Sequence, residues 1–564
     1  MLRRRMTRLS LLSFLGVAAC SSDGAGPKLP PCTAAGFNVT LPVVSAYTSF
    51  DPGTAAGCIV FPAAGAADSA EYLVVPQLTT GAPGKTSSFR LAGDTIRPAL
   101  IAPAYSAPAL DDLAPAERFH AFLRLGDQDH WRSLNPQVAV PGMMAPARSP
   151  AAPAGPPAMG SQRTFKVCAR LNCSVFDNVT ATVKALKSNL AIYVDNTAPA
   201  GGLDSAQLDT LASTFETRLY PTDTAAFGRE SDIDTNSVVM VLMTSTVNKL
   251  VSKAECDRQG GAFVAGFFFG ADLDPAFRTD SRSNKGEVFY SIVADPTGTL
   301  SCAHSTTSVQ RLVPVTFVHE FQHMISFNQH VLVRGGDAEV LWLNEGFSHY
   351  AEELGGRSYP SGSPEFSRFT IGDLYNAYHY LDSTDTHFLL PTSGIGSLAE
   401  RGAAWLFVRY LVDQYAADTT VASWSAFTRQ MVATPDTGAA NVASRTGDTF
   451  TNVVTRWALA NWVSDLPGFP APSLLKYKSW SFRATYASLN SQDPPDFPKV
   501  FPLTPIASAG RAVNLTGTLR AGSGVYGRAL QAPSAPGFTL LFSTSTGGPL
   551  DPTLLPRLTV IRIR

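Results

Sequence analysis

The stretch VTFVHEFQHMISFNQH, Val315 to His330, decides how this chain is interpreted. Its apolar residues Phe317, Phe321 and Met324 recur at the spacing of one helical face. Pro314, just before the stretch, suits the first turn of a helix, where its missing N–H costs no hydrogen bond. We therefore expect a helix that begins near Pro314 and continues through both histidines.

Three polar residues on this helix have the spacing of a metal site. His319 and His323 are four residues apart, about 6 Å along the axis and roughly 40° around it, so that both imidazoles can reach one ion. Glu320 is rotated by about 100° from His319 and can reach a water molecule beside the ion. The alternative is a helix with three exposed polar groups and no metal, and a third ligand would decide against it.

A second candidate helix can bring a carboxylate back to the same point. LWLNEGFSHYAEELGG, Leu341 to Gly356, contains Glu345, which follows His323 by enough residues for a loop at Gly335 and Gly336 to reverse the chain. Its apolar stripe consists of Leu343, Phe347, Tyr350 and Leu354, and Gly355 with Gly356 is the predicted stop signal.

These motifs resemble a known group of enzymes. HEFQHMISFNQ followed by WLNEGFSHYAEEL resembles the gluzincin clan of zinc metallopeptidases, and AGFFFGADL and SNKGEVFYSIVADP extend the likeness to the hyicolysin-like neutral metallopeptidase family. The resemblance runs from about residue 165 to 467 and is specific across 263 to 356. It implies an α+β gluzincin-type domain, a mixed sheet followed by a helical lobe, that binds Zn²⁺. It also implies that His319, His323 and Glu345 are the ligands and Glu320 the catalytic base.

Beyond those four residues the resemblance is less specific. Glu352 matches an acidic position of related aminopeptidases and is either a group that orients a ligand histidine or a solvated helix carboxylate. His349 replaces the aspartate of thermolysin-like members, and His330 is not counted as a ligand. The group that steadies the oxyanion stays unassigned among Tyr375, Tyr378, His379, Tyr380 and His387.

Composition shifts divide the 564 residues into five parts. We predict a lipoprotein-type signal over 1–20, an N-terminal β-sandwich-like domain over 21–136 and a Pro/Ala-rich linker over 137–162. The metallopeptidase domain follows over 163–499, and a small C-terminal β domain over 500–564. The two β domains therefore flank the catalytic domain.

The first twenty residues resemble an export signal. Arg3, Arg4 and Arg5 precede a short apolar run, and Val17 to Ala19 precede Cys20 as in bacterial lipoproteins, in which the cysteine is lipidated. A conventionally cleaved signal peptide is the alternative. The expected location is thus the bacterial cell envelope, with attachment through lipid only and Ser21 favouring the outer membrane, or secretion.

The cysteines and the charge agree with an exported enzyme. Apart from Cys20, six cysteines remain, and the simplest of fifteen connectivities pairs them in sequence order. Those pairs are Cys32 with Cys58, Cys168 with Cys173 and Cys256 with Cys302; free buried thiols are the alternative. With a net charge of −1 and no basic block, the sequence gives no reason to expect nucleic-acid binding.

The expected function is hydrolysis of peptide bonds in a peptide or protein substrate by a monomeric zinc endopeptidase. One alternative is an aminopeptidase, and another is a surface lipoprotein that binds a protein or polysaccharide and carries a structural or degenerate zinc site. The sequence contains no GxSxG motif, the nucleophile elbow that would favour a serine hydrolase. The strand predicted in GEVFYSIVA either pairs with the substrate backbone or lies inside the sheet.

Overall fold

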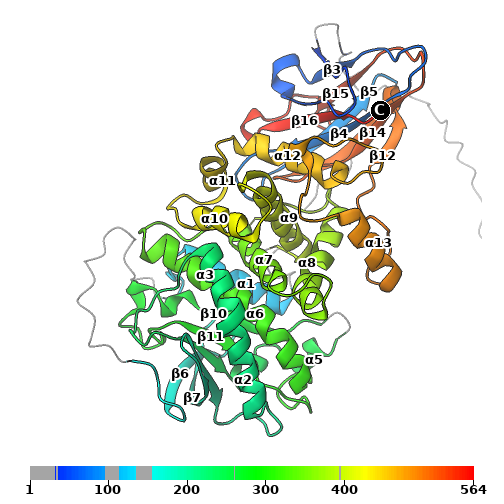
Figure 1. Cartoon of the computed structure of the whole chain (residues 1–564). Coiled ribbons are helices and arrows are strands. Elements are labelled where there is room, and N and C mark those ends of the chain that lie inside the picture. The colour runs from blue at the N-terminus through cyan, green and yellow to red at the C-terminus, as the bar shows by residue number, and fades with distance from the viewer. Residues whose placement is uncertain (1–31, 33–35, 96–113, 135–154, 259–260, 393–395) are drawn as a thin grey trace, which may run out of the picture.

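The structure is a computed structural model, and it describes residues 32, 36–95, 114–134, 155–258, 261–392 and 396–564. Figure 1 shows three layers: a β-sandwich at one end, a helical lobe in the middle and a second β region at the other end. The predicted signal over 1–20 with Cys20, and most of the predicted linker over 137–162, lie outside the described residues.

The β-sandwich combines strands from both ends of the chain. One sheet has the order β1-β3-β15-β5-β13 and the other β12-β14-β4-β16-β2. The strands are β1 (Phe37–Asn38), β2 (Tyr47–Phe50), β3 (Cys58–Phe61), β4 (Ala70–Leu78), β5 (Thr86–Gly93), β12 (Ile506–Ala509), β13 (Asn514–Arg520), β14 (Gly527–Gln531), β15 (Phe538–Ser543) and β16 (Pro556–Arg562). The expectation of separate N- and C-terminal β domains is therefore wrong, because strands of each segment pair with strands of the other.

A six-stranded mixed sheet forms the other end of the molecule. Its order is β10-β11-β9-β8-β7-β6, with β8, β9 and β11 parallel and the remaining pairs antiparallel. The strands are β6 (Gln162–Cys168), β7 (Phe176–Leu186), β8 (Leu190–Asp195), β9 (Val239–Met243), β10 (Gly266–Phe268) and β11 (Val288–Ser291). The strand predicted in GEVFYSIVA is β11, which lies inside the sheet, while β10 is an edge strand.

Helices cover this sheet and fill the middle layer (Figure 1). They are α2 (Ser205–Thr214), α3 (Tyr220–Phe227), α4 (Ser245–Asn248), α5 (Lys253–Cys256), α6 (Thr306–Phe327), α7 (Leu341–Arg357), α8 (Pro364–Asp382), α9 (Leu398–Tyr415), α10 (Val421–Val432), α11 (Gly438–Thr446), α12 (Phe450–Val463) and α13 (Phe482–Gln492). Short π-helical segments, Phe215–Leu219 and Asn328–Leu332, follow α2 and α6. Together with the sheet this gives a multidomain α+β protein.

Two predicted helix boundaries differ from the structure. Helix α6 begins at Thr306, because Ser305 caps it by accepting a hydrogen bond from the N–H of Ser308, and Pro314 lies inside the helix. Helix α7 continues through Gly355 and Gly356 to Arg357. A Cβ at either glycine would lie 3.1 Å from the side chain of Phe369 on α8, so these glycines permit close helix packing and do not end the helix.

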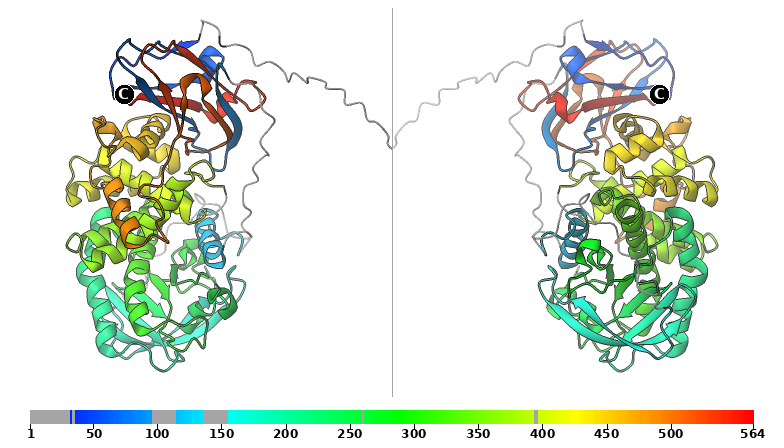
Figure 2. Two further views of the ribbon diagram at one scale, coloured as in Figure 1. Left: turned by 90° about the vertical axis from the view of Figure 1, so that its right-hand side faces the viewer. Right: turned by 90° about the vertical axis from the view of Figure 1, so that its left-hand side faces the viewer.

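Helix α1 (Pro115–Gln128) also departs from prediction. It falls within the segment expected to form a β-sandwich, yet Figure 2 shows it away from the sandwich, beside the six-stranded sheet. Its buried residues Phe119 and Leu123, with Trp131 beyond its end, belong to the apolar core that the six-stranded sheet shares with the helices. The apolar face of this helix has its partner there, which accounts for the location.

The structure confirms the sequential disulfide pairing, with bonds between Cys32 and Cys58, Cys168 and Cys173, and Cys256 and Cys302. Among the described helices, none combines the length and the apolar character that crossing a membrane requires.

Candidate metal centre

Helices α6 and α7 bring three of the predicted site residues together. His319 Nε2 and His323 Nε2 are 3.2 Å apart, and the carboxylate of Glu345 lies 3.7 Å from the former and 3.4 Å from the latter. All three side chains are buried. The four-residue spacing on α6 places the two imidazoles one turn apart, and α7 packs against α6 so that its Glu345 faces both.

Hydrogen bonds fix the orientation of both imidazoles. His319 Nδ1 lies 2.7 Å from Glu352 Oε1, and His323 Nδ1 lies 3.0 Å from Asn344 Oδ1. Because each Nδ1 faces an oxygen acceptor, the tautomer with its hydrogen on Nδ1 satisfies that bond and leaves a lone pair on Nε2. Two lone pairs and a carboxylate that converge in a buried space are a donor set suited to a divalent cation.

The protonation states agree with that donor set. Burial lowers the pKa of His323 to about 3, so this imidazole is neutral. Burial opposes ionisation of Glu345, but the adjacent imidazoles of His323 and His319 hold the pKa of Glu345 well below its ordinary value. Its Oε1 is buried without a hydrogen-bond partner among the described residues. The residues therefore fit a metal ion.

Glu352 lies at the centre of a buried network behind His319. Its Oε1 is also 3.0 Å from His349 Nδ1, which in turn lies 2.9 Å from Asp373 Oδ1 on α8. Against the lowering effect of burial, the carboxylates of Glu352 and Asp373 raise the pKa of His349 to about 10. His349 is therefore an imidazolium that contacts both Glu352 and Asp373 and steadies Glu352 against His319.

Glu320 is held from the side of the sheet. It is 1% exposed, and its Oε2 accepts a hydrogen bond of 2.9 Å from the backbone N–H of Phe268 on β10. Its Oε1 has no hydrogen-bond partner among the described residues and lies 3.5 Å from His120 Nδ1 on α1. Burial raises the pKa of Glu320 to about 6, a value suited to exchanging a proton near neutral pH.

Three of these contacts were not predicted. Asn344 directly precedes the predicted ligand Glu345, so the sequence could have suggested its side-chain amide as a hydrogen-bond partner of a ligand histidine. The Phe268 N–H carries no signal, since every residue but proline has one. His120 lies far upstream, in a segment assigned to another domain, and nothing in its local sequence points to the site.

The tyrosines and histidines considered for the oxyanion have other partners. Tyr378 bonds Lys499, Tyr380 bonds Ser523, and His387 Nδ1 lies 3.1 Å from Glu400. The rings of Tyr375 and His379 contact each other, with centroids 4.4 Å apart. The role therefore stays unassigned. His330, which the sequence analysis did not count as a ligand, lies 3.9 Å from Glu339.

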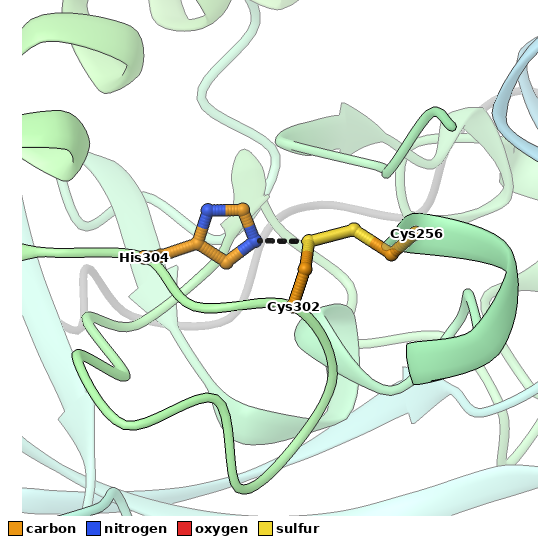
Figure 3. A group of neighbouring side chains, drawn as sticks. All are labelled: Cys256, Cys302 and His304. Atoms are coloured by element: carbon orange, nitrogen blue, oxygen red, sulfur yellow. Dashed lines mark hydrogen bonds between the residues drawn. A yellow bond between two sulfur atoms is a disulfide. The ribbon is translucent and has the colours of Figure 1, made fainter. Parts of the chain in front are cut away.

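Two further groups of potential ligands are engaged in bonds within the protein. Figure 3 shows Cys302 between Cys256 and His304, with Cys302 Sγ 3.4 Å from His304 Nε2. Since both sulfurs form the disulfide, this group offers no thiolate. In the other group, Asp232 and Asp234 lie on the loop before β9, and Ser231 and Ile233 of that loop donate hydrogen bonds to Glu287.

Comparison with known proteins agrees with this chemistry. Over 149 residues the chain is 27% identical to the neutral metalloprotease ShpI of Staphylococcus hyicus. This likeness points to a metallopeptidase. The matched segment covers 26% of this chain and 31% of the relative, so the chain spans under a third of that protein's length. No protein-family model matches the chain.

Proposed function

We propose that this protein is an exported zinc-dependent peptidase of the gluzincin type. The observation that carries the proposal is the convergence of His319 Nε2, His323 Nε2 and the Glu345 carboxylate, with each Nδ1 held by an oxygen acceptor. Two imidazoles and one carboxylate are the ligand set of catalytic zinc, and they leave a coordination position for water.

The residues of the chain have distinct roles in the proposed hydrolysis. Zinc, when bound, polarises the scissile carbonyl and makes water acidic enough to lose a proton. Glu320 takes that proton through Oε1, the oxygen that the Phe268 N–H leaves free, and passes it to the departing amine. Glu352 and Asn344 hold the ligand imidazoles in place throughout.

An endopeptidase is the form of this activity that we propose. Strand β10 is an edge strand next to Glu320, and an extended peptide can pair with such an edge along its length, with residues on both sides of the cut bond. The export signal, with lipidation of Cys20 and attachment to the cell envelope, belongs to the same proposal, and the three disulfides fit an oxidising compartment.

Substitutions of the base and of the ligands test this proposal. Glu320→Gln should retain zinc and lose about 10²-fold to 10⁴-fold in kcat, because the general base is gone while the ligands remain. His319→Ala and Glu345→Ala should lose the zinc itself. Zinc content by atomic emission and cleavage of internally quenched peptides are the measurements. The Gln329→Ala variant, changed just beyond α6, is the control and should keep both.

Two results would contradict the proposal. Full turnover by Glu320→Gln would remove Glu320 from the role of base. Stoichiometric zinc with no cleavage across a broad peptide library, in a protein whose site is open to ligands, would favour a binding lipoprotein with a structural zinc ion.

A further inference from the structure

Helix α1 covers the edge of the six-stranded sheet that strand β10 forms. Strand β10 pairs with β11 on one side, and Phe268 directs both of its backbone groups to the other side. Its N–H donates to Glu320, and its C=O accepts a hydrogen bond of 2.8 Å from Arg124 Nη2 on α1. The C=O that an added peptide strand would use next to the catalytic glutamate therefore already has a partner.

Side chains of α1 and its continuation cover three consecutive phenylalanines at this edge. The rings of Phe119 and Phe267 meet edge to face with centroids 4.9 Å apart, and the guanidinium of Arg124 lies 5.4 Å from the ring centroid of Phe268. Trp131 packs against Phe269 at 4.5 Å. These contacts follow the direction in which an extended substrate would run along β10.

The same helix reaches the reacting groups. His120 Nδ1 lies 3.5 Å from Glu320 Oε1, the carboxylate oxygen that the proposed mechanism assigns to the attacking water. Arg124 is 1% exposed and is paired with Asp127 at 3.1 Å, so the charge that holds α1 on β10 is itself compensated within the helix. Such a pair can leave the edge as a unit without leaving a buried charge in the catalytic domain.

We propose that α1 is an autoinhibitory helix that occupies the place of the peptide substrate, so that the described conformation is a latent form of the enzyme. The inference rests on the proposed peptidase function. Activation then requires that α1 leave β10, which frees Phe268 C=O for the substrate backbone and Glu320 Oε1 for water.

The β-sandwich explains how α1 is kept close to the site. The chain enters the segment containing α1 after β5, and β5 is paired with β13 and β15 from the C-terminal end. A displaced α1 therefore stays tethered to the enzyme and competes with substrate at a high effective concentration.

Two substitutions that loosen α1 through different contacts test the inference. Phe119→Ala removes the ring contact with Phe267, and Arg124→Gln removes the ion pair and the bond to Phe268 C=O. Each should raise kcat/KM for internally quenched octapeptides at least tenfold in the full-length, zinc-loaded protein. The control is Arg132→Gln, since Arg132 is an arginine of the same segment that pairs with the exposed Asp129. It should behave as the unchanged protein does.

A binding measurement separates this inference from the function on which it rests. A fluorescent peptidic hydroxamate should bind the Phe119→Ala protein at least tenfold more tightly than the unchanged protein, whether or not any peptide is hydrolysed. Equal binding and equal turnover in folded, zinc-loaded Phe119→Ala and Arg124→Gln proteins would overturn latency and leave the peptidase proposal intact. Absence of zinc from all variants would instead overturn the peptidase proposal.

His120 distinguishes a blocking helix from a working part of the active site. If α1 blocks, adding His120→Ala to the Phe119→Ala protein should leave kcat within about twofold, because the displaced helix takes no part in hydrolysis. A fall of 10²-fold or more in kcat with unchanged KM and zinc content would place His120 in the catalytic machinery and overturn the inference.

Discussion

The proposed metal centre and the β-sandwich are assembled over very different distances along the chain. The ligands on α6 and α7 come from two consecutive helices joined by one short connection. The sandwich pairs strands from opposite ends, as in the register of β13 with β5 and of β14 with β4, and an ion pair joins Arg528 to Glu71. Leu540 belongs to an apolar core confined to the sandwich, whereas Phe321 belongs to a larger core that also includes Leu73 and Val75 of β4.

This difference determines how far the folding of each region depends on the rest of the chain. The α6–α7 pair needs few long-range contacts to place its ligands, because helical spacing and one chain reversal suffice. The sandwich cannot form until nearly the whole chain is available, since half of its strands are C-terminal. The geometry of the proposed metal centre should thus be insensitive to changes in the sandwich that leave its fold intact, and the sandwich should depend on both chain ends.

Truncation at the C-terminal side gives the largest expected effect. A chain that ends at residue 499 lacks β12 to β16 and leaves the buried faces of β4 and β5 without partners. We expect the unfolding transition of the sandwich to disappear and the protein to aggregate, because unpaired apolar strands are exposed. Calorimetry and light scattering measure this. A truncated protein that retained the full transition would show that the N-terminal strands fold alone.

A single cavity in the sandwich core should have the next largest effect. Leu540 on β15 is fully buried between β3 and β5, and Leu540→Ala should cost about 2–5 kcal/mol of unfolding free energy for that region. Zinc affinity should not change, because Leu540 belongs to the separate core. Denaturant unfolding and zinc titration check the two parts. A loss of zinc affinity of more than about threefold would show that the regions are coupled.

The predictability of the molecule from sequence follows the same division. His319, His323 and Glu345 could be placed together from the sequence because the helical period and one loop define their spacing. The pairing of β4 with β14 and β16 has no comparable local signal, since any alternating strand can pair with many others. Two separate β domains were therefore the natural, and wrong, expectation.

The position of helix α1 at the proposed site also could not be predicted from the sequence. Its sequence indicates an amphipathic segment, but the partner of its apolar face, β10 with Phe267, comes much later in the chain. The contact of His120 with Glu320 follows from that docking and from no motif. By contrast, Glu352 was foreseen as one of two alternatives, because it lies on nearly the same face of α7 as Glu345, and the structure places it on His319.

Substitution of Glu352 has the smallest expected effect. Glu352→Ala removes the acceptor of His319 Nδ1 and leaves the three ligands unchanged, so that zinc affinity should fall by about 10-fold to 100-fold. Competition with a chelator of known affinity measures the dissociation constant. Glu365→Ala, which removes an exposed helix carboxylate on α8, is the matched control and should leave the affinity unchanged.

The conservative variant identifies the cause of that loss. Glu352→Gln keeps an oxygen that can accept from His319 Nδ1 but removes the charge that His349 balances. If orientation of His319 is what matters, Glu352→Gln should restore most of the affinity. If instead the negative charge strengthens the imidazole as a ligand, Glu352→Gln should fall nearly as far as Glu352→Ala. An unchanged affinity in both variants would mean that α6 alone fixes the orientation of the His319 imidazole. The hydrogen bond between His319 Nδ1 and α7 would then not be needed for zinc binding.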